Sequence, residues 1–231
     1  MFKSTKILAV LGTAFLLPLM VAAVDPQSLL GSSAQAEEEK KEPKYKNVKT
    51  RKRQSVGAKC AKALEKVQVV LEEENWAESM SMLNNIESST KTCRTPYEQT
   101  QVWKFQGYVY YSLDDFPGAI RAYKRVIDSE GTPEDLRLDT RYTLAQLYTA
   151  EGHYAEAAQE LEVWMQAATV VGNDARGLLA QIYYQLERKA DALRMIELAI
   201  ADVEAKGKLP KERWWSLQRV LYYEKNDFNR V

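Results

Sequence analysis

Three regions follow from the distribution of apolar residues along the chain. An apolar run extends from Ile7 to Val24, residues 37–54 are almost wholly charged or polar, and apolar residues then recur at helical spacing to the carboxyl end. Apolar positions three and four residues apart are typical of amphipathic helices. The pattern predicts a leader over residues 1–36, a flexible charged linker over residues 37–54 and an all-α domain over residues 55–231.

The helical region repeats. An aromatic or long residue precedes each predicted second helix: Trp76, Phe116, Tyr154, Lys189 and Phe228. These residues follow one another at steps of 40, 38, 35 and 39, so the units differ in length by only a few residues. Turn-forming stretches separate the units: SEGTPED, VVGND and KGKLPKE. The repeat predicts a solenoid of antiparallel helix hairpins with about four to five units, the last of them incomplete.

Within three units, a small residue lies between large or aromatic residues at the same positions. The matching sets are Trp103, Gly107, Tyr110, Ala119 and Tyr123; Leu144, Ala145, Tyr148, Ala157 and Leu161; and Leu179, Ala180, Tyr183, Ala192 and Ile196. A small residue allows two helices to approach closely, and rings fill the space around it. We therefore interpret these rings as packing. The exceptions are a weaker first unit, Gln106 where leucine is usual, and Arg219 at a small-residue position.

Over residues 55–231 the chain resembles the tetratricopeptide-repeat superfamily, whose units are about 34 residues long and share this pattern. More narrowly, it is similar to exported repeat proteins encoded beside TonB-type energy-transduction systems in Gram-negative bacteria. The residues that carry this likeness are the leader with its basic linker and three strings: QGYVYYSLDDFPGAIRAYKRVI, RYTLAQLYTAEGHYAEAAQELEVWM and KGKLPKERWW. The resemblance implies a periplasmic accessory protein of TonB-dependent uptake.

The leader has the features of a secretory signal peptide. Two lysines precede its apolar run, and Ala34-Gln35-Ala36 offers a cleavage site, with Val21-Ala22-Ala23 as a second candidate. An uncleaved anchor helix is the alternative, because the run is nearly long enough to span a bilayer. We expect cleavage after Ala36, export to the periplasm and no integral membrane span in the mature protein.

The charge of the chain favours a protein partner over nucleic acid. The 32 basic and 32 acidic residues give a net charge of zero, so bulk electrostatics attract neither nucleic acid nor an anionic membrane. The basic part of the linker would suit phosphates or phospholipid headgroups, but an exported protein rarely meets nucleic acid. We interpret it as a solvated linker, since it has too few apolar residues to offset its ordering entropy.

The chain has two cysteines, Cys60 and Cys93. Cys60 starts the first predicted helix and Cys93 follows the end of the second, so an antiparallel hairpin brings the two residues side by side. In an oxidising compartment this arrangement predicts a disulfide, with two idle thiols as the alternative.

The sequence does not predict an enzyme. The only histidine, His153, lies in the turn EGHY, and no serine or cysteine can be tied to it. Neither a phosphate-binding glycine loop nor metal-ligand spacing occurs, so we expect no cofactor and no metal.

A peptide-binding groove is expected along the first helices of the units, as the resemblance implies. The residues that we expect to bind are Gln101, Lys104, Tyr108, Tyr111, Tyr142, Gln146, Gln181, Tyr184 and Tyr223. The same register also places Asp139, Thr149, Asp174, Gly177, Arg213, Ser216 and Val220 in the groove. Tyrosine rings with amides between them suit an extended or polyproline peptide, and a segment of a TonB-like or related inner-membrane protein is the expected partner.

Two alternatives to this groove remain. One is that the tyrosines of the first helices pack only against one another. The other is that the protein is a structural scaffold of a cell-envelope assembly without a peptide ligand.

Overall fold

The computed structural model describes residues 43–46, 48, 54–89 and 91–225. Nine α-helices make up almost all of these residues, and none of them forms a strand. The helices are α1 (Ala58–Glu72), α2 (Trp76–Ser88), α3 (Pro96–Ser112), α4 (Phe116–Asp128), α5 (Glu134–Ala150), α6 (Tyr154–Ala167), α7 (Asn173–Gln185), α8 (Lys189–Ala205) and α9 (Glu212–Glu224).

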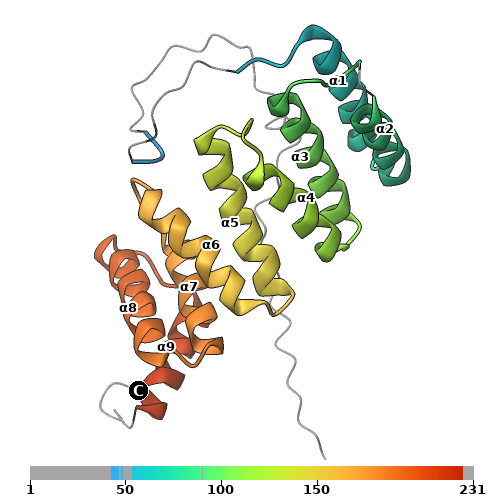
Figure 1. Cartoon of the computed structure of the whole chain (residues 1–231). Coiled ribbons are helices and arrows are strands. Elements are labelled where there is room, and N and C mark those ends of the chain that lie inside the picture. The colour runs from blue at the N-terminus through green and yellow to red at the C-terminus, as the bar shows by residue number, and fades with distance from the viewer. Residues whose placement is uncertain (1–42, 47, 49–53, 90, 226–231) are drawn as a thin grey trace, which may run out of the picture.

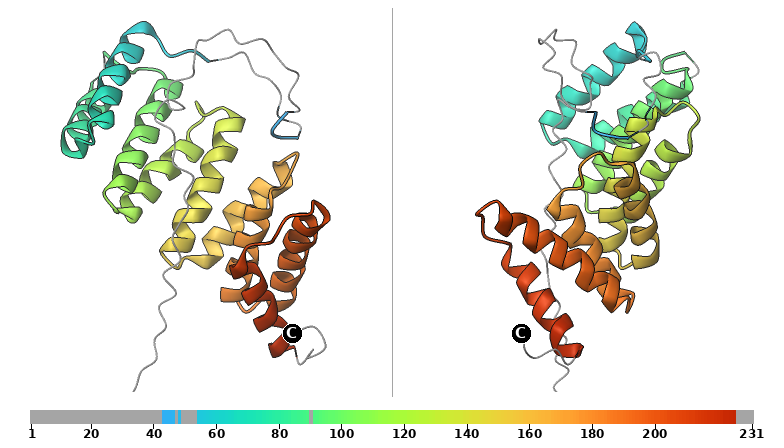
Figure 2. Two further views of the ribbon diagram at one scale, coloured as in Figure 1. Left: turned by 180° about the vertical axis from the view of Figure 1, so that it is seen from behind. Right: turned by 90° about the vertical axis from the view of Figure 1, so that its left-hand side faces the viewer.

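The helices form antiparallel hairpins that follow one another in chain order. Each helix packs mainly against its neighbours in the sequence, and the α1–α2 hairpin lies at the opposite end of the array from α8 and α9 (Figure 1; Figure 2). The predicted all-α solenoid is confirmed, with four hairpins and the further helix α9 in the described residues.

The second helix of each hairpin begins where the sequence repeat predicts. Helices α2, α4, α6 and α8 start at the four aligned residues themselves. Asn75 and Asp115 cap the first two of these helices, and Pro117 occupies the first turn of α4, where a missing N–H costs nothing. The fifth aligned residue, Phe228, lies outside the described residues.

All four hairpin turns contain a residue in the left-handed backbone conformation, two positions before the second helix. These residues are Glu74, Asp114, Gly152 and Glu187, with φ of 55°, 57°, 76° and 57°. Only one of the four is glycine, although glycine alone adopts this conformation without a steric penalty. The other three turns therefore carry backbone strain that the sequence repeat did not reveal.

We expect Glu74→Gly to stabilise the protein by about 0.5 kcal/mol. The left-handed conformation costs an L-residue roughly 1–2 kcal/mol, and the entropy of glycine cancels roughly 0.5–1 kcal/mol of that gain. Urea denaturation measures the difference. The matched control is Glu73→Gly, because Glu73 has the same exposed side chain but a φ of −82°. If both variants lose stability equally, the turn is not strained.

Gly107, the glycine among the small residues of the repeat, lies beneath a ring, and the corresponding Ala145 and Ala180 are fully buried. A side-chain carbon added to Gly107 would come within 2.7 Å of the Tyr123 ring, so the interpretation of this motif as packing is confirmed. Gln106, the departure from the motif, is buried and donates to Asn84 at 3.1 Å and to Glu87 at 2.7 Å. A polar contact between α2 and α3 thus replaces the usual leucine.

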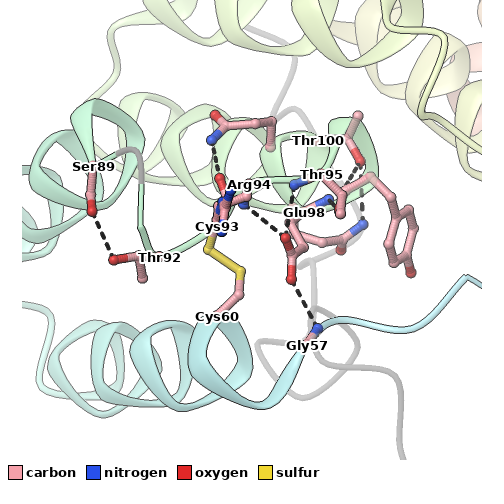
Figure 3. Close-up of a disulfide and its surroundings, with 12 residues drawn as sticks. Gly57, Cys60, Ser89, Thr92, Cys93, Arg94, Thr95, Glu98 and Thr100 are labelled. Atoms are coloured by element: carbon pink, nitrogen blue, oxygen red, sulfur yellow. Dashed lines mark hydrogen bonds between the residues drawn. A yellow bond between two sulfur atoms is a disulfide. The ribbon is translucent and has the colours of Figure 1, made fainter.

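The amino-terminal end of α3 is tied to that of α1 by two different links (Figure 3). Cys60 and Cys93 form a disulfide, with their Cα atoms 4.8 Å apart. Glu98, in the first turn of α3, accepts hydrogen bonds from the backbone N–H groups of Gly57, Arg94 and Thr95 at 2.9, 2.8 and 2.9 Å. A disulfide and hydrogen bonds to a carboxylate therefore hold the start of α1 to the start of α3.

The predicted signal peptide over residues 1–36, with its cleavage site at Ala36, lies outside the described residues. In the part that the structure describes, none of the helices has the length and apolar character needed to cross a membrane. The same described residues contain no group of three or more histidine, cysteine or acidic side chains able to hold a metal ion.

Candidate functional site

Helix α3 carries four of the residues predicted to line a groove, and the structure places them differently. Gln101 is 6% exposed, so its side chain offers a ligand almost no surface, which corrects the predicted set. Tyr108 and Tyr111 are half-buried, and each packs on a neighbouring ring, that of Trp76 at 6.0 Å and that of Phe116 at 5.9 Å between centroids.

The fourth of these residues, Lys104, is half-buried between charged neighbours. Burial lowers the pKa of its ammonium group, while the carboxylates of Asp139 and Asp135 on α5 partly offset this effect. Lys104 thus faces an acidic part of α5, and its positive charge stabilises the carboxylates there.

Helix α5 carries Tyr142 and Gln146, both half-buried. The Tyr142 ring packs against the Trp164 ring of α6, with 4.7 Å between centroids. Burial and the nearby Asp174 carboxylate raise the pKa of the Tyr142 hydroxyl, so this residue belongs to the same acidic surface.

Helices α7 and α9 carry the remaining predicted residues. Gln181 and Tyr184 are half-buried, and the Tyr184 hydroxyl donates to Glu224 at 3.2 Å, whereas Tyr223 is 64% exposed. Gly177 is a correction, because Trp214 of α9 covers it: a side-chain carbon at Gly177 would lie 2.4 Å from the indole nitrogen. No groove therefore passes over Gly177.

Burial separates the predicted binding tyrosines from most of those in the repeat motif. Tyr123, Tyr148, Tyr183 and Tyr222 are buried, while the motif residue Tyr110 is half-buried. The predicted binding tyrosines all keep part of their surface exposed: Tyr108, Tyr111, Tyr142, Tyr184 and Tyr223. The alternative that they only pack on one another accounts for part of their surface but not for the rest.

A short segment of the predicted linker lies against the body of the repeat domain. Residues 43–46, which we call the arm, run antiparallel to the loop after α6, with a β-bridge between Tyr45 and Ala168. The N–H of Lys46 donates to the Ala167 carbonyl at 2.7 Å, and the N–H of Thr169 donates to the Lys44 carbonyl at 3.0 Å. The interpretation of the whole 37–54 stretch as a flexible linker missed this contact.

Tyr45 fills what we call the slot, which is formed by Leu138, Asp139, Trp164, Ala168 and Thr169. Its side chain is 4% exposed and packs with Leu138 and Ala168. Its hydroxyl donates to the Asp139 carboxylate and accepts from the Trp164 indole N–H at 3.0 Å. Burial, followed by the hydrogen bond to Asp139, raises the pKa of the Tyr45 hydroxyl far above its usual value. The ring is therefore held as a neutral phenol.

The slot shares Asp139 with the predicted groove and lies next to Tyr142 of that groove. Asp139 belongs to the set that the repeat register predicts, and Tyr142 packs on the Trp164 that binds Tyr45. Tyr45 is the only aromatic residue between positions 37 and 54, and this was the one signal by which the sequence could have revealed the contact.

The fold is shared with solved structures of helical repeat proteins. The MamA protein of Desulfovibrio magneticus RS-1, from residue 41 to its end, is 17% identical, with a TM-score of 0.57 over 75% of this chain and 89% of that one. Apo RapI is 12% identical, with a TM-score of 0.57 over 74% of this chain and 65% of that one. No family model and no curated protein sequence matches the chain.

A third similar structure contains tetratricopeptide-like repeats by its own description. It is a kinesin light chain with nearly identical repeats from Podosopora anserina, 19% identical, with a TM-score of 0.53 over 72% of this chain and 87% of that one. At these identities the likeness shows the fold, and the fold is a tetratricopeptide-like helical repeat.

Proposed function

We propose that this chain is an adaptor without catalytic activity that binds an extended peptide on the exposed face of its first helices. One observation carries the proposal: the five predicted binding tyrosines all keep exposed surface, whereas every tyrosine of the repeat motif except Tyr110 is buried. Rings that are partly exposed on a rigid scaffold provide contact area at low entropic cost.

We further propose that the protein acts in the periplasm as an accessory of a TonB-dependent uptake system. The leader sequence, the resemblance to exported repeat proteins and the disulfide, a bond typical of oxidising compartments, support this location. The proposed partner is the extended, proline-rich periplasmic segment of a TonB-like protein, because a stiff segment loses little entropy when it docks on tyrosine faces.

The test is a titration of the periplasmic region of the cognate TonB-like protein against the wild type and a triple variant, Tyr108→Ala, Tyr142→Ala and Tyr184→Ala. Each aromatic contact contributes roughly 0.5–1.5 kcal/mol, so we expect at least about a tenfold loss of affinity. Calorimetry measures the binding, and circular dichroism checks that the variant remains helical.

A matched control removes three exposed apolar side chains from other parts of the surface, by Val163→Ala, Leu198→Ala and Leu209→Ala. Val163 and Leu198 lie on second helices and Leu209 in a loop, so this variant should bind as the wild type does. Equal binding by the wild type and the tyrosine variant would refute the proposed surface. No binding by either would favour the scaffold role.

A further inference from the structure

We propose that the slot is a recognition site for an extended peptide in which a lysine directly precedes a tyrosine. The arm occupies this site in cis and is displaced by a partner segment of the same chemistry. This inference rests on the proposed role as a peptide-binding adaptor but not on a TonB-like partner.

Backbone pairing gives the slot its affinity for an extended chain. Besides the two backbone hydrogen bonds of the arm, the Thr169 hydroxyl donates to the Pro43 carbonyl at 2.6 Å. Pairing of this kind uses groups that every peptide has, as in β-strand addition to an exposed edge. The loop from Ala167 to Thr169 can therefore hold any segment that is extended at these positions.

Side-chain contacts give the slot its preference for tyrosine. Leu138 and Ala168 pack on the ring, while the buried hydroxyl both donates to Asp139 and accepts from Trp164. A phenylalanine there would leave the half-buried indole N–H without this acceptor, which costs about 1 kcal/mol. The slot thus distinguishes tyrosine from other rings.

Charge adds a preference for a lysine just before the tyrosine. The Lys44 ammonium lies 2.6 Å from an Asp139 oxygen, and Asp135 lies on the same helix. Because both partners of this ion pair are largely exposed, it contributes only about 0–1 kcal/mol. Lys104 also interacts with Asp139, so this carboxylate keeps a positive neighbour when the arm leaves.

The arm makes few buried contacts with the slot, so a competing peptide can displace it. Only Tyr45 is buried among its four residues, since Pro43, Lys44 and Lys46 are exposed. A tethered segment nevertheless competes at an effective concentration on the order of millimolar. A free peptide with the same contacts should therefore bind poorly until the arm is disabled.

The experiment measures fluorescence anisotropy of a labelled peptide, EPKYKNV, which copies residues 42–48. Full-length Tyr45→Ala protein should bind it at least about tenfold more tightly than the wild type, whose own arm competes. The same peptide with alanine in place of tyrosine should not bind measurably. Equal affinity for both proteins, no binding to either, or binding that does not need the peptide tyrosine would overturn the proposal.

A second pair of variants locates the site. In the Tyr45→Ala background, Asp139→Asn should weaken peptide binding several-fold, because the Asp139 carboxylate contacts both the tyrosine and the lysine of the arm. The matched control is Asp128→Asn, since Asp128 lies at the end of α4, and it should have no effect. Equal effects of the two substitutions would contradict the assignment.

Sedimentation distinguishes cis from trans occupancy. The wild type should remain monomeric as its concentration rises, whereas a dimer lost on Tyr45→Ala would show that arms exchange between copies and would refute cis occupancy. The experiments use a peptide of this chain, so a failure to bind the TonB-like segment leaves them interpretable.

Discussion

Replacing both cysteines, by Cys60→Ala and Cys93→Ala together, is expected to lower the free energy of unfolding by about 3–4 kcal/mol. The bond closes a loop between residues separated by 33 positions, and this closure restricts the unfolded chain. Both cysteines are fully buried, and alanine fits the space they leave with a small cavity at most. Guanidinium denaturation of the oxidised wild type and the variant measures the loss.

Reduction supplies the control for this double variant. The wild type in reductant should lose a similar amount of stability, whereas the variant should not respond to reductant. Thiol titration of the unreduced, denatured protein should find no free thiols. Two free thiols, or unfolding curves that coincide, would contradict the prediction.

Local patterns made the fold predictable from the sequence. The starts of α2, α4, α6 and α8 follow from turn residues, caps and a large residue within a few positions of one another. Gly107 and Tyr123 belong to one hairpin, so their packing is also encoded over a short distance. Repeats place such signals at regular steps, and each occurrence supports the others.

The candidate site was predictable only in part. The register placed Asp139 and Tyr142 on one face because that step needs only helical periodicity. The docking of Tyr45 was not predictable, since its partners Asp139 and Trp164 follow it by 94 and 119 residues. A charged stretch has no periodicity that could reveal so distant a contact. The packing of Trp214 over Gly177 was also not predictable, because it depends on how two neighbouring units pack against each other.

On the proposed function, the arm protects part of the surface that would bind the partner. Exposed tyrosines beside an acidic patch would attract any basic, extended segment. A resident arm of the same chemistry would raise the affinity that such a partner needs, because the partner would have to displace Tyr45. Selectivity would then depend on contacts beyond the slot, such as those proposed for Tyr108 and Tyr184.

The second large effect is expected at Glu98, where Glu98→Ala should cost about 3 kcal/mol. This carboxylate is 6% exposed and accepts from three backbone N–H groups, one of them at the start of α1. The substitution removes the carboxylate, which abolishes the capping box of α3 and leaves its N–H donors without acceptors. Glu78→Ala is the matched control, because Glu78 occupies the same third position of α2 but is exposed. That variant should lose about 0.5 kcal/mol or less.

The effect of Glu98 should also depend on pH. Burial raises the pKa of Glu98, but the hydrogen bonds from Thr95, Gly57 and Arg94 outweigh it and hold the pKa below its ordinary value. Because the folded-state pKa lies below that of the unfolded chain, about 4.3, the ionised carboxylate stabilises the protein fully above that pH. This contribution is lost as the pH falls through the folded-state pKa. The stability gap between the wild type and Glu98→Ala, measured by urea denaturation, should therefore be constant from about pH 7 to 5.5 and narrow below about pH 4. A gap that stays constant down to pH 3 would show that Glu98 acts by packing and not through its charge.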